Sequence, residues 1–281
     1  MDAVSVQVLV DEQAQAPGLA AEHGLSIRVR AAHLDLLFDA GQSDLLLANA
    51  AALGADLGAL AWLVLSHGHY DHTGGVPALL AAGARPHVLW GRGAWARRRA
   101  ATPGGPAREI GIPWPRALLQ EQGVVGREIR APHPLHPGVW LTGPARPTPD
   151  LTAPTLRRAR GRRWPLDRFP EELALSLLTV RGLVLVTGCS HTGIANLVAG
   201  AQQATGVDRL YAVLGGLHLH QASAAQCGAV AAFLRAAGVE HLWVNHCTGR
   251  KACELLAATL PGRVEWAGAG FTPALPPLRL Q

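Results

Sequence analysis

The sequence predicts a mixed α/β fold, and two observations lead to that prediction. A unit of buried strand, histidine-bearing turn and helix occurs three times along the 281 residues, and such alternation is typical of a sheet covered by helices. The composition, with 49% hydrophobic and 16% charged residues, is that of an ordinary globular protein. A chain of this length can bury a large core.

The N-terminal part of the chain is expected to form strands followed by a short helix. Three stretches are apolar or alternate between apolar and polar residues, namely VSVQVLVD (4–11), LSIRVRA (25–31) and LDLLFDAG (34–41). The stretch SDLLLANAAALG is typical of a helix, with Ser43 as its N-cap and Gly54 as its end.

Histidine stands at the turn of each strand–turn–helix unit. The units are AWLVLS-HGHYDHTGG-VPALLAAG (61–83), GLVLVTG-CSHTG-IANLVAGAQQATG (182–206) and HLWVN-HCTG-RKACELLAATL (241–260). A further strand, RLYAVLGG, ends in LHLH, and the helix after it opens with Ser223 and Gln226 at the spacing of a capping box. Because sites in α/β folds form at the carboxyl ends of strands, we expect these histidines to meet in space.

The organisation expected is one domain spanning residues 1–281, with an irregular insertion around 100–170. That segment is rich in Pro, Gly and Arg and has little periodicity. It is expected to hold loops plus one or two short strands, such as GVWLTG (138–143). No repeat of fixed period occurs.

Residues 67–72 concentrate side chains that bind metals: His67, His69, Asp71 and His72. Imidazole and carboxylate are good ligands for a borderline divalent ion such as zinc. His67 and His69 are two positions apart, so in an extended turn they point the same way and can reach one ion. Asp71 and His72 can serve a second ion nearby. The cofactor predicted is zinc, as one or two ions, with manganese and iron as alternatives.

Seven further histidines are expected to be surface or hydrogen-bonded structural residues, because part-buried histidine is common without a metal. They are His23, His33, His87, His133, His136, His220 and His241.

The cysteines, the hydropathy and the net charge of the chain indicate its compartment and its partners. The four cysteines suggest neither a disulfide framework nor zinc knuckles, which favours reduced thiols in a cytoplasmic protein. No basic leader and no run of about 20 apolar residues occurs, so no membrane association is expected.

The net charge is +5, with arginine clusters at 97–99 and 157–163. These clusters are either solvated surface or attract a small anionic substrate; no nucleic-acid motif accompanies them, so nucleic acid is not an expected partner.

The motifs resemble those of a known family. HGHYDH resembles the His-x-His-x-Asp-His signature of the metallo-β-lactamase superfamily, and LLFDAG resembles its early strand ending in Asp-x-Gly. EHGLS, LSHGHYDHTGG, TGCSHTGI, GGLHL and HCTG resemble a subfamily of metal-dependent hydrolases, which includes archaeal enzymes proposed to condense a dihydropterin with a ribofuranosylaminobenzene phosphate. The matches run in order from residue 22 to 249. The resemblance implies a four-layer αββα sandwich with a metal site at one edge, between two sheets.

The resemblance also implies roles for single residues. The metal ligands that it implies are His67, His69, Asp71, His72, His191 and His246. His191 is the candidate for the remaining histidine of the first site, and His246 matches the last histidine ligand of the superfamily. Asp71 would orient the attacking water, and His218 would protonate the leaving oxygen. Arg146, in TGPAR, is the candidate for clamping an anionic substrate.

One position departs from the superfamily pattern. Most members carry, after the strand ending in Thr-Gly, an aspartate that bridges two metals, whereas this chain has Cys189 in VTGCSH. A thiolate is an excellent zinc ligand. A buried inert cysteine is the alternative, and the sequence leaves both open.

These features predict a hydrolase in which a metal-bound hydroxide attacks an anionic, phosphate-bearing ester. A pterin-related condensing enzyme and a non-catalytic metal-binding scaffold or sensor are the alternatives. A di-iron protein that handles oxygen or nitric oxide is disfavoured, because such relatives have glutamate where His69 stands. A nuclease is disfavoured because such relatives carry a large inserted domain. The sequence leaves the oligomeric state open.

Overall fold

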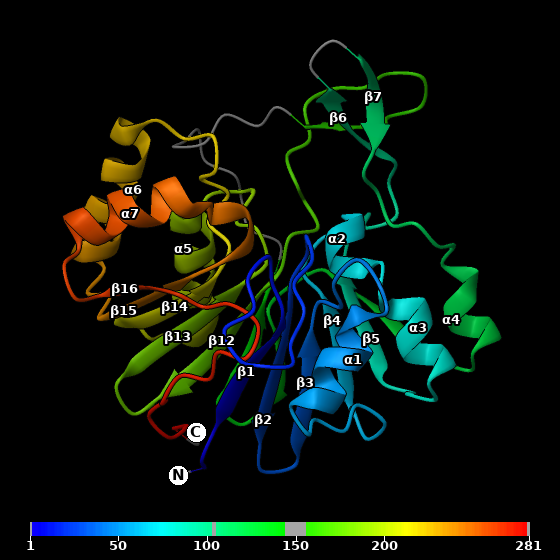
Figure 1. The fold of residues 1–281 in the computed structure, drawn as a ribbon, viewed down its shortest axis with the longest axis horizontal. Coiled ribbons are helices and arrows are strands. Elements are labelled where there is room, and N and C mark those ends of the chain that lie inside the picture. Colours follow the sequence, from blue (N-terminus) through cyan, green and yellow to red (C-terminus); the bar gives the residue numbers. More distant parts are fainter. Residues whose placement is uncertain (1, 103–104, 144–155, 280–281) are drawn as a thin grey trace.

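The computed structural model describes residues 2–102, 105–143 and 156–279 and arranges them mainly in four layers (Figure 1). Two β-sheets pack face to face in the middle, and helices cover the outer face of each sheet. This αββα arrangement confirms the fold class predicted from the sequence.

The first sheet has the strand order β1-β2-β3-β4-β5-β8, and β3, β4, β5 and β8 run parallel. Its strands are β1 Ser5–Val10, β2 Ser26–Ala31, β3 Leu34–Phe38, β4 Trp62–Leu65, β5 His87–Gly91 and β8 Gly126–Ile129. The helices in this half are α1 Leu45–Ala52, α2 Tyr70–Thr73, α3 Val76–Ala81 and α4 Ala117–Glu121.

The second sheet has the strand order β16-β15-β14-β13-β12-β10-β9, and β13 to β16 run parallel. Its strands are β9 His133–His136, β10 Val139–Thr142, β12 Ala174–Thr179, β13 Gly182–Thr187, β14 Leu210–Gly215, β15 His241–Val244 and β16 Val264–Trp266. The helices in this half are α5 Ile194–Thr205, α6 Ala224–Ala236 and α7 Arg250–Thr259.

The helix ends agree only in part with those predicted from the sequence. The capping box of Ser223 and Gln226 at the start of α6 is confirmed. The N-cap of α1 is Asp44 and not Ser43, although the Ser43 hydroxyl accepts from the backbone N–H of Leu45 at 3.1 Å while it donates to the carboxylate of Glu22. Among the described segments, no helix is long and apolar enough to cross a membrane.

Alternation along buried strands produces the layers. In β13, Val184 and Val186 point into the core between the two sheets. Leu183 and Leu185 point the other way and pack with the side chains of α5, α6 and α7. Each such side chain contributes about 1.5–3 kcal/mol when it is fully buried, so a strand that is apolar on both faces is held firmly in the centre.

The described residues of the segment around 100–170 are more regular than its composition predicts. The GVWLTG stretch forms β10 as expected, and β8 and β9 extend the two main sheets. A small third sheet, here called the arm, consists of β6 Arg98–Thr102, β7 Gly105–Glu109 and β11 Arg157–Arg158 (Figure 1). Because every residue of β7 is exposed, the arm has no apolar alternation from which the sequence could predict it.

Arg98 fastens the arm to the body of the protein. Its side chain is fully buried and forms ion pairs with Asp167 and Glu171. It also donates to the carbonyl oxygen of Ala94 at 2.7 Å and to that of Gly68 at 3.5 Å. Position 68 must be glycine, because a Cβ there would lie 2.0 Å from the oxygen of Ala94. Arg98 therefore holds both the arm and the histidine-bearing turn after β4.

We predict that Arg98→Ala lowers the free energy of unfolding by about 3–5 kcal/mol, because it removes the cation with which two buried carboxylates are paired. Arg97→Ala is the matched control, since Arg97 forms an exposed pair with Glu109 and should cost less than about 1 kcal/mol. Urea unfolding followed by circular dichroism measures both values. Equal losses in the two variants would contradict the anchoring role of Arg98.

Candidate metal centre

Strand ends from both sheets meet at one edge of the sandwich. The parallel strands β3 and β4 of the first sheet and β13, β14 and β15 of the second place their carboxyl ends there. Four non-glycine residues at these ends have left-handed φ angles between 45° and 62°, namely Asp39, Ser190, His218 and His246. Such conformations are sparsely populated and gather at functional sites, where the surrounding structure enforces them.

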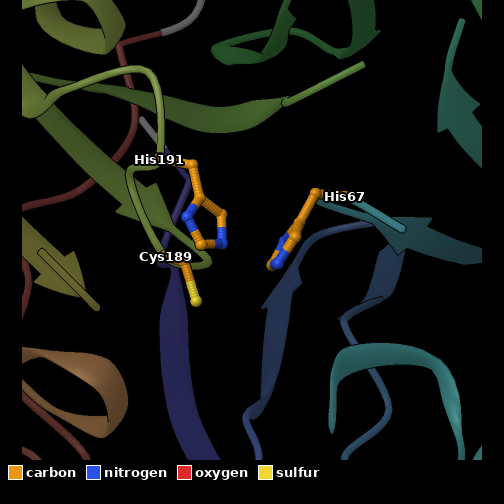
Figure 2. A group of neighbouring side chains, drawn as sticks. All are labelled: His67, Cys189 and His191. Atoms are coloured by element: carbon orange, nitrogen blue, oxygen red, sulfur yellow. The ribbon is translucent and has the colours of Figure 1, made fainter. Parts of the chain in front are cut away.

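The first group of histidines consists of His67, His69 and His191. Nε2 of His67 lies 3.0 Å from Nδ1 of His69, and the ring centroids of His67 and His191 are 4.8 Å apart. Figure 2 shows the imidazoles of His67 and His191 facing each other with Cys189 beside them. Nε2 of His191 is buried and has no hydrogen-bond partner among the described residues. A bound cation would satisfy that atom.

The second group consists of Asp71, His72 and His246. The Nε2 atoms of His72 and His246 are 3.0 Å apart. Oδ2 of Asp71 lies 3.8 Å from Nε2 of His72 and 3.4 Å from Nε2 of His246. All three side chains are buried. Two imidazole nitrogens and one carboxylate oxygen thus point toward one place.

Cys189 lies between the two groups. Its ligand atom is within 4.8 Å of those of His67 and His191 in one direction, and of those of His72 and His246 in the other. The sulfur is 3.2 Å from Nε2 of His72. Burial raises the pKa of the Cys189 thiol well above its usual value, so a nearby cation would be needed to ionise it. A ligand shared by two ions would occupy this location.

Asp39 fixes which nitrogen of each histidine faces the site. Its carboxylate accepts hydrogen bonds from the backbone N–H of Ser66 at 2.7 Å, the Ser66 hydroxyl at 2.6 Å and Nδ1 of His72 at 2.6 Å. Because the Ser66 hydroxyl donates to Asp39, it accepts from Nδ1 of His67 at 2.9 Å. Both Nδ1 atoms therefore carry hydrogen, and the Nε2 lone pairs of His67 and His72 face the site.

Glu12, at the end of β1, orients the second group in the same way. Its Oε1 accepts from Nδ1 of His246 at 2.8 Å and from Nδ1 of His23 at 2.7 Å. Burial opposes ionisation of Glu12, but these hydrogen bonds outweigh it and lower its pKa to about 2. His23 also lies 3.2 Å from Oδ2 of Asp71, and its hydrogen bonds to Asp71 and Glu12 raise its pKa to about 9.

The electrostatics of the two groups differ. Burial lowers the pKa of all three histidines of the first group well below the usual value, which keeps them neutral, as metal ligation requires. Burial also opposes protonation of His246, but its interactions with Cys247, Asp71 and Glu12 outweigh it and raise its pKa well above the usual value. The second group thus lies in a negative field that would also attract a cation.

A pocket of about 450 Å³ opens over both groups, a volume in the range of small-molecule sites. Four members of the two groups line it, namely His69, Asp71, His191 and His246. The other lining residues are Glu12, Gln13, His23, Tyr70, Ala100, Arg108, Ile110, Leu156, Cys189, His218, His220, Cys247, Gly249, Arg250 and Trp266. Residues of the arm and of α7 therefore share this pocket with the histidines.

The structure brings most of the sequence-predicted site residues together. The residues it places at this edge are His67, His69, Asp71, His72, Cys189, His191, His218 and His246. Arg146 lies outside the described residues. His23 and His220, expected to be surface or hydrogen-bonded structural residues, are exposed, and both also line the pocket. The one sequence signal for His23 was its place in the EHGLS motif; Glu12 and Arg108 had none.

Comparisons with known proteins agree with this architecture. The model of the metallo-beta-lactamase superfamily matches residues 23–198. The chain is 28% identical over 244 residues to the 7,8-dihydropterin-6-methyl-4-(beta-D-ribofuranosyl)-aminobenzene-5'-phosphate synthase of Methanocaldococcus jannaschii, covering 82% of each protein. The crystal structure of Tm1679, a metal-dependent hydrolase of the beta-lactamase superfamily, is 29% identical with a TM-score of 0.84, covering 98% of this chain and 100% of that one. A diphosphatase from the PhnP family, 12% identical with a TM-score of 0.56 over 99% and 100% of the two chains, has the same fold.

We predict that Asp39→Asn weakens zinc binding by about 10–100-fold, because the amide cannot accept all the hydrogen bonds that orient His67 and His72. Asp35→Asn is the matched control. Asp35 lies on β3, which Asp39 directly follows, but it pairs with Arg28 and belongs to none of the donor groups. Titration of each variant against a chromophoric chelator measures the affinity. Equal affinities in the two variants would show that Asp39 does not position the ligands.

Proposed function

Because the chain belongs to the metallo-beta-lactamase superfamily, we propose that it is a metal-dependent hydrolase acting on an anionic, phosphate-bearing ester. The observation that carries the proposal is the meeting of two donor groups, with Cys189 between them, at the base of one pocket. The similarity to Tm1679, itself named a metal-dependent hydrolase, supports the reaction class.

The donor set fits a borderline divalent ion, and zinc is the metal we propose. The first group would hold one ion through imidazole nitrogens, and the second group would hold another through Asp71, His72 and His246. Cys189 would contact both ions. Buried imidazoles whose second nitrogen is already hydrogen-bonded to Asp39, Ser66 or Glu12 are the usual form of zinc ligands.

Two side chains would handle protons. When bound, the metal would supply an ionised water near neutral pH and polarise a substrate oxygen. Asp71, in contact with His23 and facing the pocket, would orient the attacking water. His218 lines the pocket after β14, and its Nδ1 is buried without a partner among the described residues. It is our candidate for the donor of a proton to the leaving oxygen.

Phe169 shields the first group. Its ring stacks on that of His191 with centroids 3.9 Å apart and planes 8° apart, and it also contacts the edge of His69. Because Phe169 is fully buried, this side of His191 is closed to water. The open side of the imidazole faces the other donors.

Two arginines in the pocket support the proposal that the substrate is anionic. Arg108 on β7 and Arg250 at the start of α7 line the pocket, and within the described part of the chain neither has a carboxylate partner. Arg108 lies over the ring of Tyr70 and donates to its hydroxyl at 3.0 Å. A guanidinium held in this way can bind a phosphate through two parallel hydrogen bonds. We therefore propose Arg108 and Arg250 for the role that the sequence assigned to Arg146.

A condensing enzyme is the second candidate function. One observation favours it: the Methanocaldococcus relative that matches 82% of this chain is named a synthase, and its name includes a 5'-phosphate. The same pocket and the same arginines would serve that reaction. A non-catalytic scaffold would need neither a pocket of about 450 Å³ nor cations at its rim.

We predict that His67→Ala and His72→Ala each lose bound zinc and hydrolytic activity while the core strands stay folded. Elemental analysis and a screen of phosphomonoesters, phosphodiesters, lactones, thioesters and pterin precursors measure the two properties. His136→Ala and His241→Ala are the controls, because neither belongs to a donor group: His136 is hydrogen-bonded to the carbonyl oxygen of Pro137, and His241 stacks on Trp243. Zinc bound at full stoichiometry in both His67→Ala and His72→Ala would refute the proposed ligands. Turnover only with the pterin precursors would favour the synthase.

We predict that Arg108→Gln raises KM by about 10–100-fold with a small change in kcat, since a hydrogen bond to a charged group contributes about 1.5–3 kcal/mol. Arg99→Gln is the matched control on the same arm, because Arg99 pairs with Glu109, lies over Trp164 and does not line the pocket. Steady-state kinetics on the best substrate from the screen decide the outcome. An unchanged KM in Arg108→Gln would remove Arg108 from the substrate site.

A further inference from the structure

Cys247 is a buried thiol that the proposed hydrolase does not use. It follows β15 in the HCTG motif, beside His246, and only 9% of it is exposed. Its sulfur lies 3.6 Å from the carbonyl oxygen of Cys189. The ligand atoms of Cys189, His218 and Cys247 all lie within 4.8 Å of one another. A third set of donors is therefore built beside the two histidine groups and shares Cys189 with them.

The sheet itself brings the two cysteines together. Strand β14 lies between β13 and β15, and Gly216 directly follows it. A Cβ at Gly216 would lie 2.6 Å from the sulfur of Cys247 and 3.4 Å from Cα of Cys189. The thiol of Cys247 thus fills the space that any other residue at 216 would take. The cysteines come from the strands on either side and meet above the end of β14.

His218 completes the set from β14. Its backbone has a φ of 51°, a conformation that non-glycine residues rarely adopt. Its Nδ1 is buried without a hydrogen-bond partner among the described residues. A buried imidazole nitrogen without a hydrogen-bond partner can bind a cation through its lone pair, and two buried cysteines lie beside the ring. The pocket lies directly over the three residues and could admit an ion.

We propose that Cys189, His218 and Cys247 form a third site, for a soft, thiophilic cation such as Cd²⁺ or Cu⁺. Two sulfurs and one imidazole are a softer donor set than either histidine group, and soft donors select soft ions. Three protein ligands leave the fourth tetrahedral position to a water or small anion from the pocket.

Occupation of this site would oppose the proposed hydrolase, a consequence that rests on the proposed function. Cys189 cannot lie between the two histidine groups and bind a third ion without weakening its contact with the first two. A ring nitrogen of His218 that binds a metal cannot donate a proton from that same atom. Soft cations would therefore act as inhibitors that compete for two residues of the site.

Cadmium titration of the full-length, metal-free protein tests the site. In the wild type we expect a thiolate-to-cadmium absorption band from two sulfurs and a ¹¹³Cd resonance in the range of mixed sulfur and nitrogen ligation. Cys247→Ala should lower the band about twofold, because one of two sulfur donors is lost. Cys253→Ala is the matched control, since Cys253 lies on α7 and does not line the pocket. Cys247→Ser, which keeps the size of the side chain, carries the test if Cys247→Ala does not fold.

The double variant His67→Ala/His72→Ala separates this proposal from the hydrolase. It removes members of both histidine groups but leaves the three donors of the soft site, so the two-sulfur band should persist. The soft site is refuted if Cys247→Ser keeps the full wild-type band, or if the double variant loses it. The proposed hydrolase fails on a different result, namely zinc retained at full stoichiometry in both His67→Ala and His72→Ala.

Discussion

The buried carboxylate of Asp39 is the constraint on which the candidate site depends. It accepts hydrogen bonds from Ser66 and His72 and, through Ser66, sets the orientation of His67. The second sheet reaches this point only because residue 188 is glycine: a Cβ on Gly188 would lie 2.2 Å from the Ser66 hydroxyl and 3.2 Å from Oδ2 of Asp39. The contact fixes how closely the two sheets approach at this edge. The distance between the histidines that follow β4 and those that follow β13 and β15 depends on this approach.

The fold could be predicted from the sequence because its signals are local. Strands that are apolar on both faces, such as GLVLVT in β13, and turns that join them to amphipathic helices can be identified within windows of about ten residues. The ordered motifs between residues 22 and 249 then indicated the superfamily that the family model confirms. The arm was missed because its strands bury no apolar face. Arg98, which holds it in place, stands within a run of three arginines of which only it is fully buried.

Some residues of the candidate site could likewise be predicted from the sequence, and others could not. His67, His69, Asp71 and His72 share one turn, so their density alone singled them out. Residues that act through distant neighbours carried no such signal. His23 looked like a bystander until its contacts with Glu12 and Asp71 were visible, and Arg108 reaches the pocket only because the arm folds over it. A sequence pattern reports which atoms are available, whereas their partners depend on how strands far apart in the chain are placed side by side.

Cys189 connects the chemistry of the three donor sets. An aspartate offers two oxygens, so it can bind two cations at once with a separate atom for each. A cysteine offers one sulfur, which must be shared, and a buried thiol ionises only where a cation stabilises the thiolate. The sulfur of Cys189 has histidines on two sides and Cys247 on a third. A thiolate in place of the carboxylate therefore makes the proposed centre softer. It also makes the occupancy of each proposed metal position depend on the others, because all of them use the sulfur of Cys189 as a ligand.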